Sequence, residues 1–226
     1  MMISPERYYE EYLQGKTKEQ IMSAIRSLKQ AMGHLKNTME NPKPVQEKYI
    51  LPSPNTRLHC TRIYLDRAKQ AYIEAGGIYT PSKSEVKSAE FDSNMDFISK
   101  ITFSIGGFFG GFRVYVAELT DHLFAYAYTN PWDDEEQLVP VDEDDTPVTK
   151  ETFIAALLNL HIGEWRRYYS TERFGYWVLD GTQWELVFEY NNGQKPVSFF
   201  GSNAYPYNFK KFKGLFGIDD EDNDNE

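Results

Sequence analysis

The sequence predicts an α+β protein in which an antiparallel helical hairpin, similar to a coiled coil, precedes an antiparallel β-sheet with covering helices. Two observations support this fold class. Between residues 17 and 75, apolar side chains recur every three or four positions, which is the period of an amphipathic helix. After residue 100 the period changes to two, and pairs that contain glycine separate the alternating segments. We therefore expect a helical arm over residues 1–80, a sheet with helices over 81–218, and an acidic disordered tail over 219–226.

The helical arm is predicted from two helices with matching apolar seams. Thr17 and Gln20 have the spacing of a capping box, in which side chains satisfy free amide groups at a helix start. A loop near residues 42–53 is long enough for a second helix, over residues 54–75, to return antiparallel. The predicted seam residues are Ile21, Ile25, Leu28, Met32, Leu35 and Met39 in the first helix, and Leu58, Thr61, Leu65, Ala68, Tyr72 and Ala75 in the second. These seams pair either within one chain or between two chains, and the second arrangement makes a homodimer.

A helix, three strands and a second helix are predicted after the arm. Ser82 and Glu85 form another capping box, at the start of a helix that extends to residue 97. A three-stranded meander follows, because apolar residues then alternate: Ile101, Phe103, Ile105; Phe112, Val114, Val116; Phe124, Tyr126, Tyr128. The glycine-rich sequence IGGFFGGF does not match a phosphate-binding loop, and it favours a hairpin with close backbone contact. Thr149 is the expected N-cap of the next helix, which ends near Gly163.

Residues 173–216 are predicted to form three antiparallel strands and a short helix. Residues 174–179 are apolar on both faces, which is typical of a central strand, and residues 183–190 alternate between apolar and polar. Asn192-Gly193 suits a tight hairpin turn into a short strand over residues 197–200. Three phenylalanines at helical spacing then predict a covering helix: Phe209, Phe212 and Phe216. Residues 98–162 and 165–217 thus predict the same order of elements, so one sheet built from two βββα halves is an alternative description of the fold.

Three segments resemble sequences of a known group. The pattern DGTQWELVFEY…GSNAYPYNF is similar to the C-terminal motif of an uncharacterised protein family from gut Clostridia and related Firmicutes, and EQIMSAIRSLKQAMGHLKNTME and LHIGEWRRYY are similar to other parts of that group. The resemblance implies a bacterial source. It implies no activity and transfers no functional residues.

The formal net charge of −10 comes mainly from two acidic runs. The tail contains one run, and residues 133–145 contain the other, whose carboxylates are Asp133, Asp134, Glu135, Glu136, Asp142, Glu143, Asp144 and Asp145. Such runs are commonly solvated loops and disordered tails. They also fit a surface that imitates nucleic acid and attracts a basic partner. We treat the second run as a candidate partner-binding site.

The sequence contains no known catalytic signature. The four histidines are dispersed, no metal-binding spacing is present, and the single Cys60 excludes an internal disulfide. We therefore expect no metal and no cofactor. His161, Glu164, Arg166 and Asp180 are the residues that an unfamiliar enzyme site would use, since His161 can exchange a proton and either Arg166 or Arg167 can hold an anion.

Three hypotheses for function remain. The first is a non-enzymatic interaction protein, for example a bacterial or mobile-element inhibitor that acts as a decoy for a nucleic-acid-binding partner. The second is an enzyme with a site around His161, and the third is nucleic-acid binding by cations of the arm: Arg57, Arg62, Arg67 and Lys69. The sequence has no signal peptide at its start and no long apolar run, which predicts a cytoplasmic protein that does not enter a membrane.

Overall fold

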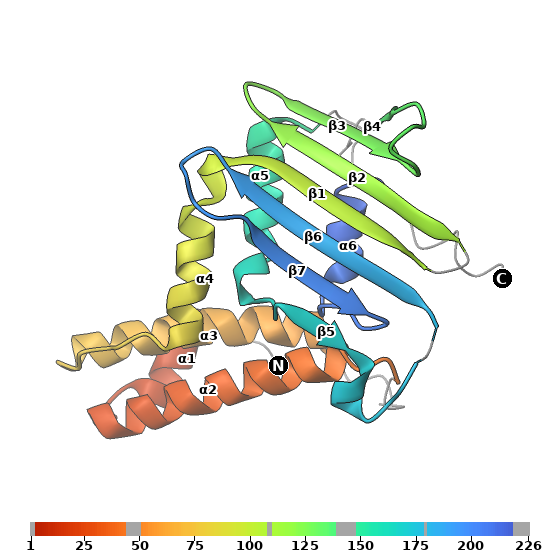
Figure 1. Ribbon diagram of the computed structural model, residues 1–226. Helices are drawn as coiled ribbons and strands as arrows, with labels where there is room; N and C mark the ends of the chain where they lie inside the picture. The colour runs from red at the N-terminus through yellow and green to blue at the C-terminus, as the bar shows by residue number, and fades with distance from the viewer. Residues whose placement is uncertain (1–2, 44–50, 108–109, 139–147, 179, 219–226) are drawn as a thin grey trace. The chain divides into compact units, whose positions relative to one another are not determined.

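The computed structural model describes residues 3–43, 51–107, 110–138, 148–178 and 180–218, and Figure 1 shows its helices and strands. The chain divides into two compact units, Met1–Pro81 and Ser82–Glu226. The first unit is helical, and the second contains one seven-stranded sheet with helices, so the α+β class is confirmed. Among the described residues, no helix combines the length and the apolar character needed to cross a membrane.

The first unit is built on two long helices that pack together. Helix α2 spans Lys18–Met39 and begins with the predicted capping box, in which Thr17 accepts from the Gln20 amide. Helix α3 spans Pro54–Glu74. The buried residues of the pair are Ile21, Ile25, Met32 and Leu35 in α2, and Leu58, Leu65, Ala68 and Ala71 in α3. Four of the six predicted seam residues of α2 are therefore buried within a single chain, without a second copy, whereas Leu28 and Met39 are only partly buried.

The predicted seam of α3 is wrong in its last turn. Ala71 is buried, whereas Ala75 caps the helix and is exposed, and Tyr72 lies close to Gly77. An alanine has no side chain beyond Cβ, so two helices approach closely where one lies between them. The three-residue step from Ala68 to Ala71 therefore replaces the predicted four-residue step to Tyr72.

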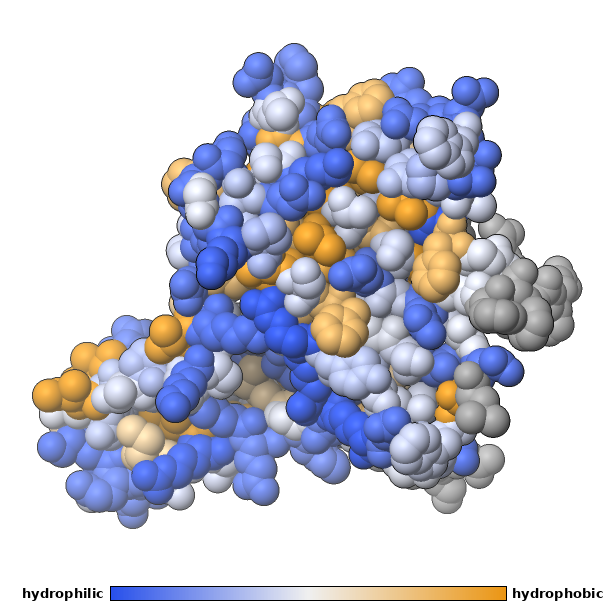
Figure 2. Space-filling view, viewed as in Figure 1, coloured by the Kyte–Doolittle hydropathy of each residue, from blue (hydrophilic) through white to orange (hydrophobic). Residues whose placement is uncertain are grey.

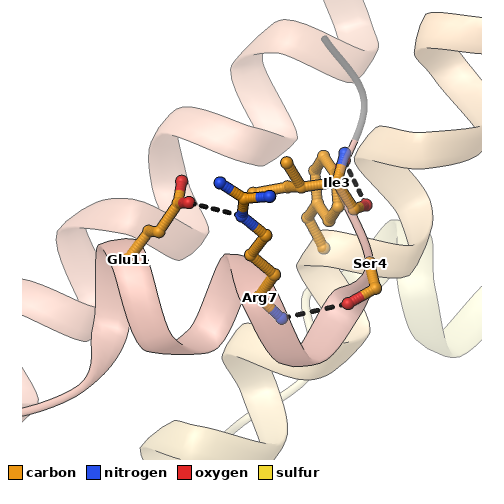
Figure 3. A network of polar contacts seen from close by, with 5 residues as sticks. Ile3, Ser4, Arg7 and Glu11 are labelled. Atoms are coloured by element: carbon orange, nitrogen blue, oxygen red, sulfur yellow. Dashed lines mark hydrogen bonds and ion pairs between the residues drawn. The ribbon is translucent and has the colours of Figure 1, made fainter.

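The N-terminal segment folds onto α3. Helix α1 (Pro5–Tyr8) continues into the π-helical turn η1 (Tyr9–Leu13), and the Leu13 side chain is buried. The Tyr64 hydroxyl of α3 accepts a hydrogen bond from the Ile3 amide, 3.0 Å away, and donates one to the Ile3 carbonyl, 2.9 Å away. The rings of Tyr8 and Tyr64 stack with centroids 4.4 Å apart. Figure 3 shows Ile3 beside the Ser4 cap on the Arg7 amide and the Arg7–Glu11 ion pair.

We expect Tyr64→Phe to loosen this segment. The substitution keeps the stacked ring but removes both hydrogen bonds to Ile3, so it should lower the free energy of unfolding of the first unit by about 1–2 kcal/mol. Hydrogen exchange of the amides between Ile3 and Leu13 should accelerate. The control is Tyr12→Phe, because Tyr12 is 56% exposed and the described structure gives its hydroxyl no hydrogen bond. Equal exchange in the two variants would contradict the role of the Tyr64 hydroxyl.

The second unit contains one seven-stranded sheet. Its strands lie in the order β4-β3-β2-β1-β6-β7-β5, so β1 and β6 are central. Every neighbouring pair is antiparallel except β5 and β7, which are parallel. The strand bounds are β1 Ile98–Gly107, β2 Gly111–Leu119, β3 Leu123–Tyr128, β4 Glu136–Leu138, β5 Tyr168–Ser170, β6 Thr182–Tyr190 and β7 Val197–Ser202. The predicted meander of β1, β2 and β3 is confirmed.

Helices α4, α5 and α6 cover one face of this sheet (Figure 1). The helical bounds are α4 Lys83–Ser93, η2 Met95–Phe97, α5 Lys150–Asn159, η3 Ile162–Glu164, η4 Thr171–Phe174 and α6 Phe209–Gly214. The predicted caps at Ser82 and Thr149 are both present. The core beneath the helices is rich in aromatic rings: Phe103 of β1 lies 5.1 Å from Phe212 and 5.9 Å from Phe216, between ring centroids.

The predicted central strand over residues 174–179 is wrong. Phe174 ends the turn η4, Gly175 has a left-handed backbone with φ 77°, and Trp177 is 80% exposed. The strand that precedes β6 in the chain is instead β5, which pairs with β7 over Tyr168–Ser170. The apolar character of residues 174–179 on both sides of the chain therefore did not indicate burial.

The two predicted halves share their elements but not their strand pairing. In the first half, β1, β2 and β3 pair in chain order. In the second half, β6 pairs with β7, and β5 adds to the outer side of β7 in parallel. A strand that was not predicted, β4, lies within the acidic run and pairs with β3.

Candidate interaction surface

The second face of the sheet is covered by no helix of the described part of the second unit. Side chains of a strand alternate between the two faces, and the core positions of β1 and β2, such as Phe103 and Tyr115, lie on the helix side. Their neighbours in the chain, Ser104 and Val116, therefore lie on the other face. We call this second face the open face.

Strand register arranges the side chains of the open face in rows that cross the sheet, and three of these rows start at β3. The first row is Tyr128, Val114, Ser104, Glu185, Phe200 and Tyr168. The second is Tyr126, Val116, Thr102, Val187 and Ser198. The third is Phe124, Glu118, Lys100 and Glu189. Each row thus begins at an aromatic side chain of β3.

Besides Phe112 of β2, the aromatic rings on the open face form two groups. On β3, the ring centroids of Phe124 and Tyr126 are 5.5 Å apart, and those of Tyr126 and Tyr128 are 6.2 Å apart. At the other end of the first row, Tyr168 and Phe200 are 5.0 Å apart and 50% and 47% exposed. On the face that Figure 2 shows, apolar side chains lie among polar ones instead of forming one continuous patch. Tyr126 is buried among its neighbours, whereas the exposed rings of Phe124, Tyr168 and Phe200 can stack against a planar or cationic group of a ligand.

Carboxylates outnumber cations in these rows. Glu118, Glu185 and Glu189 are acidic, and Lys100 is the single cation; its Nζ lies 4.0 Å from a Glu118 oxygen. Burial raises the pKa of Tyr126, and the nearby charges of Glu118 and Glu135 raise it further. Glu135 belongs to the predicted acidic run, so the charge of that run acts on the aromatic side chains of β3.

The acidic residues predicted to bind a partner lie at the β3 end of the sheet as far as the structure describes them. Asp133, Asp134 and Glu135 are exposed in the connection between β3 and β4. Glu136 belongs to β4, not to a loop as predicted, and its carboxylate pairs with Arg113 of β2. The remaining residues, Asp142, Glu143, Asp144 and Asp145, lie outside the described residues.

The residues of the predicted enzyme site are not all brought together. His161 follows α5 in a left-handed conformation with φ 51°, Glu164 ends η3, and Arg166 is exposed beyond it. The charge of Glu164 acts on Asp92 of α4. The end of α4 is joined to the β6–β7 turn, since the Asn192 amide donates to the Asn94 side chain.

Asp180 lies at the opposite end of β6 from that turn. It precedes Thr182, the first residue of the strand, whereas the turn follows Tyr190, the last residue. A strand rises about 3.3 Å per residue, so the length of β6 separates the two ends by about 26 Å. Asp180 therefore cannot act in one site with Glu164.

The cations of the arm do not form one basic face. Side chains of an α-helix rotate by about 100° per residue, so Arg57, Arg62 and Arg67 of α3 point in three different directions. Arg67 lies over the Tyr9 ring, 3.9 Å from its centroid, and pairs with Glu74 at 3.4 Å. Lys69 pairs with Asp66 at 3.5 Å. At least two of the four predicted cations are therefore engaged within the first unit.

Sequence reasoning found the residues of the open face without assigning them to it. The apolar alternation that predicted β2 and β3 contains Val114, Val116, Phe124, Tyr126 and Tyr128, and all five lie on the open face. The only available signal was that Tyr115 and Ala117, on the opposite side of β2, are apolar as well. Sequence reasoning named Arg167 only as an alternative to Arg166 for holding an anion, and it missed Lys87 and Tyr190, which lie in other segments of the chain.

Comparisons with known proteins give no further assignment: no protein-family model, no curated protein and no solved structure matches this chain. The class of protein that the structure itself defines is an α+β protein with a sheet face that no helix of the described part of the second unit covers and that carries aromatic rings and carboxylates.

Proposed function

We propose that the chain is a non-enzymatic interaction protein whose open face binds a basic surface of another protein. The observation that carries this proposal is the combination of aromatic rings and carboxylates in the three rows of the open face. A guanidinium group stacks on aromatic rings and pairs with carboxylates at the same time, so arginine side chains fit this chemistry. Phosphate groups do not, because the rows carry more acidic than basic side chains.

The acidic run supports the same kind of partner. Asp133, Asp134 and Glu135 are exposed next to β3, and in the sequence the run continues to Asp145. A local concentration of negative charge accelerates encounters with a basic protein. Since proteins that bind nucleic acids carry basic surfaces, we infer that the partner is a nucleic-acid-binding protein, for which this chain acts as a decoy, and that the chain comes from a bacterium or one of its mobile elements.

A defined pair of peptides tests the chemistry of the open face. We expect an arginine-rich peptide to bind the full chain about fivefold more tightly than a lysine-rich peptide of equal length and charge, because stacking on rings favours the guanidinium group. The double substitution Phe124→Thr/Phe200→Thr should abolish this preference. Glu185→Gln/Glu189→Gln should instead weaken the binding of both peptides and reduce the salt dependence of that binding.

The control variant is Glu90→Gln/Asp96→Asn, which removes two exposed carboxylates from the helical part of the unit. It should leave the preference and the affinities close to wild type. Equal affinities for the two peptides in the wild-type chain would contradict the arginine preference. An equal loss of affinity in the control variant would show that net charge alone, and not the open face, causes binding.

The same variants decide whether a natural partner uses this surface. A protein captured from a bacterial lysate supports the proposal only if Phe124→Thr/Phe200→Thr loses it and the control variant retains it. The decoy interpretation further requires the wild-type chain to displace nucleic acid from that protein. A partner that binds nucleic acid and this chain simultaneously would rule out that interpretation.

A further inference from the structure

A second cluster of polar groups lies on the helix side of the sheet, away from the open face. Lys87 belongs to α4, one turn before Phe91, whose ring packs edge-on against Phe188 and Phe199 at 5.1 and 5.9 Å. Arg167 lies between η3 and β5, and Tyr190 ends β6 on the same side as Phe188. Three separate segments of the chain therefore contribute to the cluster.

Arg167 is the centre of this cluster. Its guanidinium group lies 4.7 Å from the centroid of the Phe199 ring, and its Nη1 donates to the Ser198 carbonyl at 3.1 Å. The backbone carbonyl of Arg167 accepts from the Phe200 amide at 3.1 Å, which fixes the start of its side chain at β7. Because only one guanidinium nitrogen reaches Ser198, the remaining N–H groups of Arg167 are available to a ligand.

The electrostatics of the cluster are unusual because two cations lie near each other. Burial lowers the pKa of Lys87, and the charge of Arg167 lowers it further. Burial also lowers the pKa of Arg167 itself. Within the described residues, neither side chain has a carboxylate partner. Like charges that are partly removed from water are unfavourable unless an anion compensates them.

Tyr190 adds a hydrogen-bond donor to the two cations. Its hydroxyl oxygen is buried and has no hydrogen-bond partner in the described part of the chain. Burial raises the pKa of Tyr190 to about 12, although the charge of Arg167 opposes this effect. The hydroxyl therefore stays protonated at neutral pH and can donate to an anion. Buried polar groups normally have a partner, so this one requires an explanation.

A purely structural role explains only one member of the cluster. Residues 197–199 of β7 lie beyond the pairing with β5, so the Ser198 carbonyl is at a sheet edge, and Arg167 satisfies it. This role accounts for Arg167. It accounts neither for the second cation at Lys87 nor for the hydroxyl of Tyr190.

The acidic groups nearby form a different pair. Burial and then the charge of Glu164 raise the pKa of Asp92. The charges that act on Lys87 and Arg167 include neither carboxylate. The cation pair is therefore not neutralised by this acidic pair.

We propose that Lys87, Arg167 and Tyr190 form a binding site for a phosphate group. A phosphate dianion matches the charge of two cations, and its oxygens accept from the guanidinium fork, the ammonium group and the phenol together. Arg167 is exposed, so such a ligand can approach it from solvent. The Tyr190 hydroxyl is buried, so it would contact the ligand from the core side of the site. The site is independent of the proposed protein interaction, since it lies on the other side of the sheet.

Calorimetric titration of the full chain with inorganic phosphate tests the site. A titration with chloride at the same ionic strength is the comparison. We expect one phosphate to bind per chain. Arg167→Gln and Lys87→Gln should each weaken binding about tenfold or more, and Tyr190→Phe should weaken it severalfold, because charge-assisted hydrogen bonds are the stronger ones. Lys83→Gln, at an exposed position of the same helix, should bind phosphate as the wild-type chain does.

Several outcomes would overturn the proposal. These are an absence of phosphate-specific heat in the wild-type chain, an affinity that none of the three substitutions changes, or an equal loss in Lys83→Gln, which would indicate non-specific attraction. Circular dichroism of each variant shows whether it is folded, and Arg167→Lys replaces Arg167→Gln if that variant is not. Parallel titrations with phosphoserine and a nucleoside monophosphate distinguish a free phosphate ion from a phosphomonoester. The compound that resembles the natural ligand should bind most tightly.

Discussion

Phe103→Ala is expected to destabilise the second unit by about 3–5 kcal/mol, since this is the usual cost of removing a fully buried phenylalanine. Phe103 is 0% exposed on the central strand β1. Its ring contacts those of Tyr115, Phe209, Phe212 and Phe216, so one substitution opens a cavity between β1, β2 and α6. A loss of this size is a large part of the about 5–15 kcal/mol that stabilises a typical domain.

Denaturation followed by tryptophan fluorescence measures this effect, because all four tryptophans of the chain lie in the second unit. The control is Phe124→Ala, the same chemical change on the opposite face of the sheet, where the ring is 44% exposed. It should cost about 1 kcal/mol or less, as surface substitutions usually do. Similar losses in the two variants would show that the open face is covered, and the proposed interaction surface would have to be abandoned.

The contrast between Phe103 and Phe124 also explains what the sequence could predict. Period-two alternation identified β1, β2 and β3 correctly, because the backbone sends successive side chains to opposite faces. It could not identify the core face of β3. The positions of β3 on the helix side are Ala125 and Ala127, whereas the larger rings of Phe124 and Tyr126 lie opposite, where Tyr126 is nonetheless buried.

The usual expectation that the larger apolar side chains face the core fails at β3 for a physical reason. Much of the core volume is supplied by rings from the helices, such as Phe153 of α5 and Phe216 after α6, which lie 5.9 Å apart. Small side chains on the strand leave room for those rings at normal packing density. This requirement depends on helices far away in the sequence, so the pattern of one strand does not reveal it.

Short elements with distant partners escaped prediction for a related reason. The caps at Thr17, Ser82 and Thr149 were found because a cap depends on residues only three positions apart. Strand β5 depends on a parallel partner about thirty residues later in the chain, and three residues carry no readable period. The Lys87–Arg167–Tyr190 cluster is harder still to predict, because no two of its members belong to one motif.

Gly163→Ala is the second substitution with a large expected effect. An added Cβ would lie 2.8 Å from the Ser88 Oγ, 2.9 Å from the Ser88 carbonyl oxygen and 3.0 Å from the Ser88 Cα. The hydroxyl can rotate away, but the backbone atoms of α4 cannot, so η3 and α4 must move apart. Overpacking of this kind costs about 1–3 kcal/mol. Because Lys87 is the neighbour of Ser88 in α4, the same movement should also weaken phosphate binding if the proposed site exists.

Gly214→Ala provides the matched control, since a Cβ at that position meets no atom within 4 Å. It should leave stability unchanged or raise it by up to about 1 kcal/mol, because alanine favours helices more than glycine does. Adding Ser88→Ala to Gly163→Ala should recover only part of the loss, since the contacts with the backbone of Ser88 remain. Full recovery would place the strain in the hydroxyl alone, and no loss in Gly163→Ala would show that η3 and α4 are not in close contact. Only close contact would hold Lys87 near Arg167, so this measurement bears on the geometry of the phosphate site independently of any ligand.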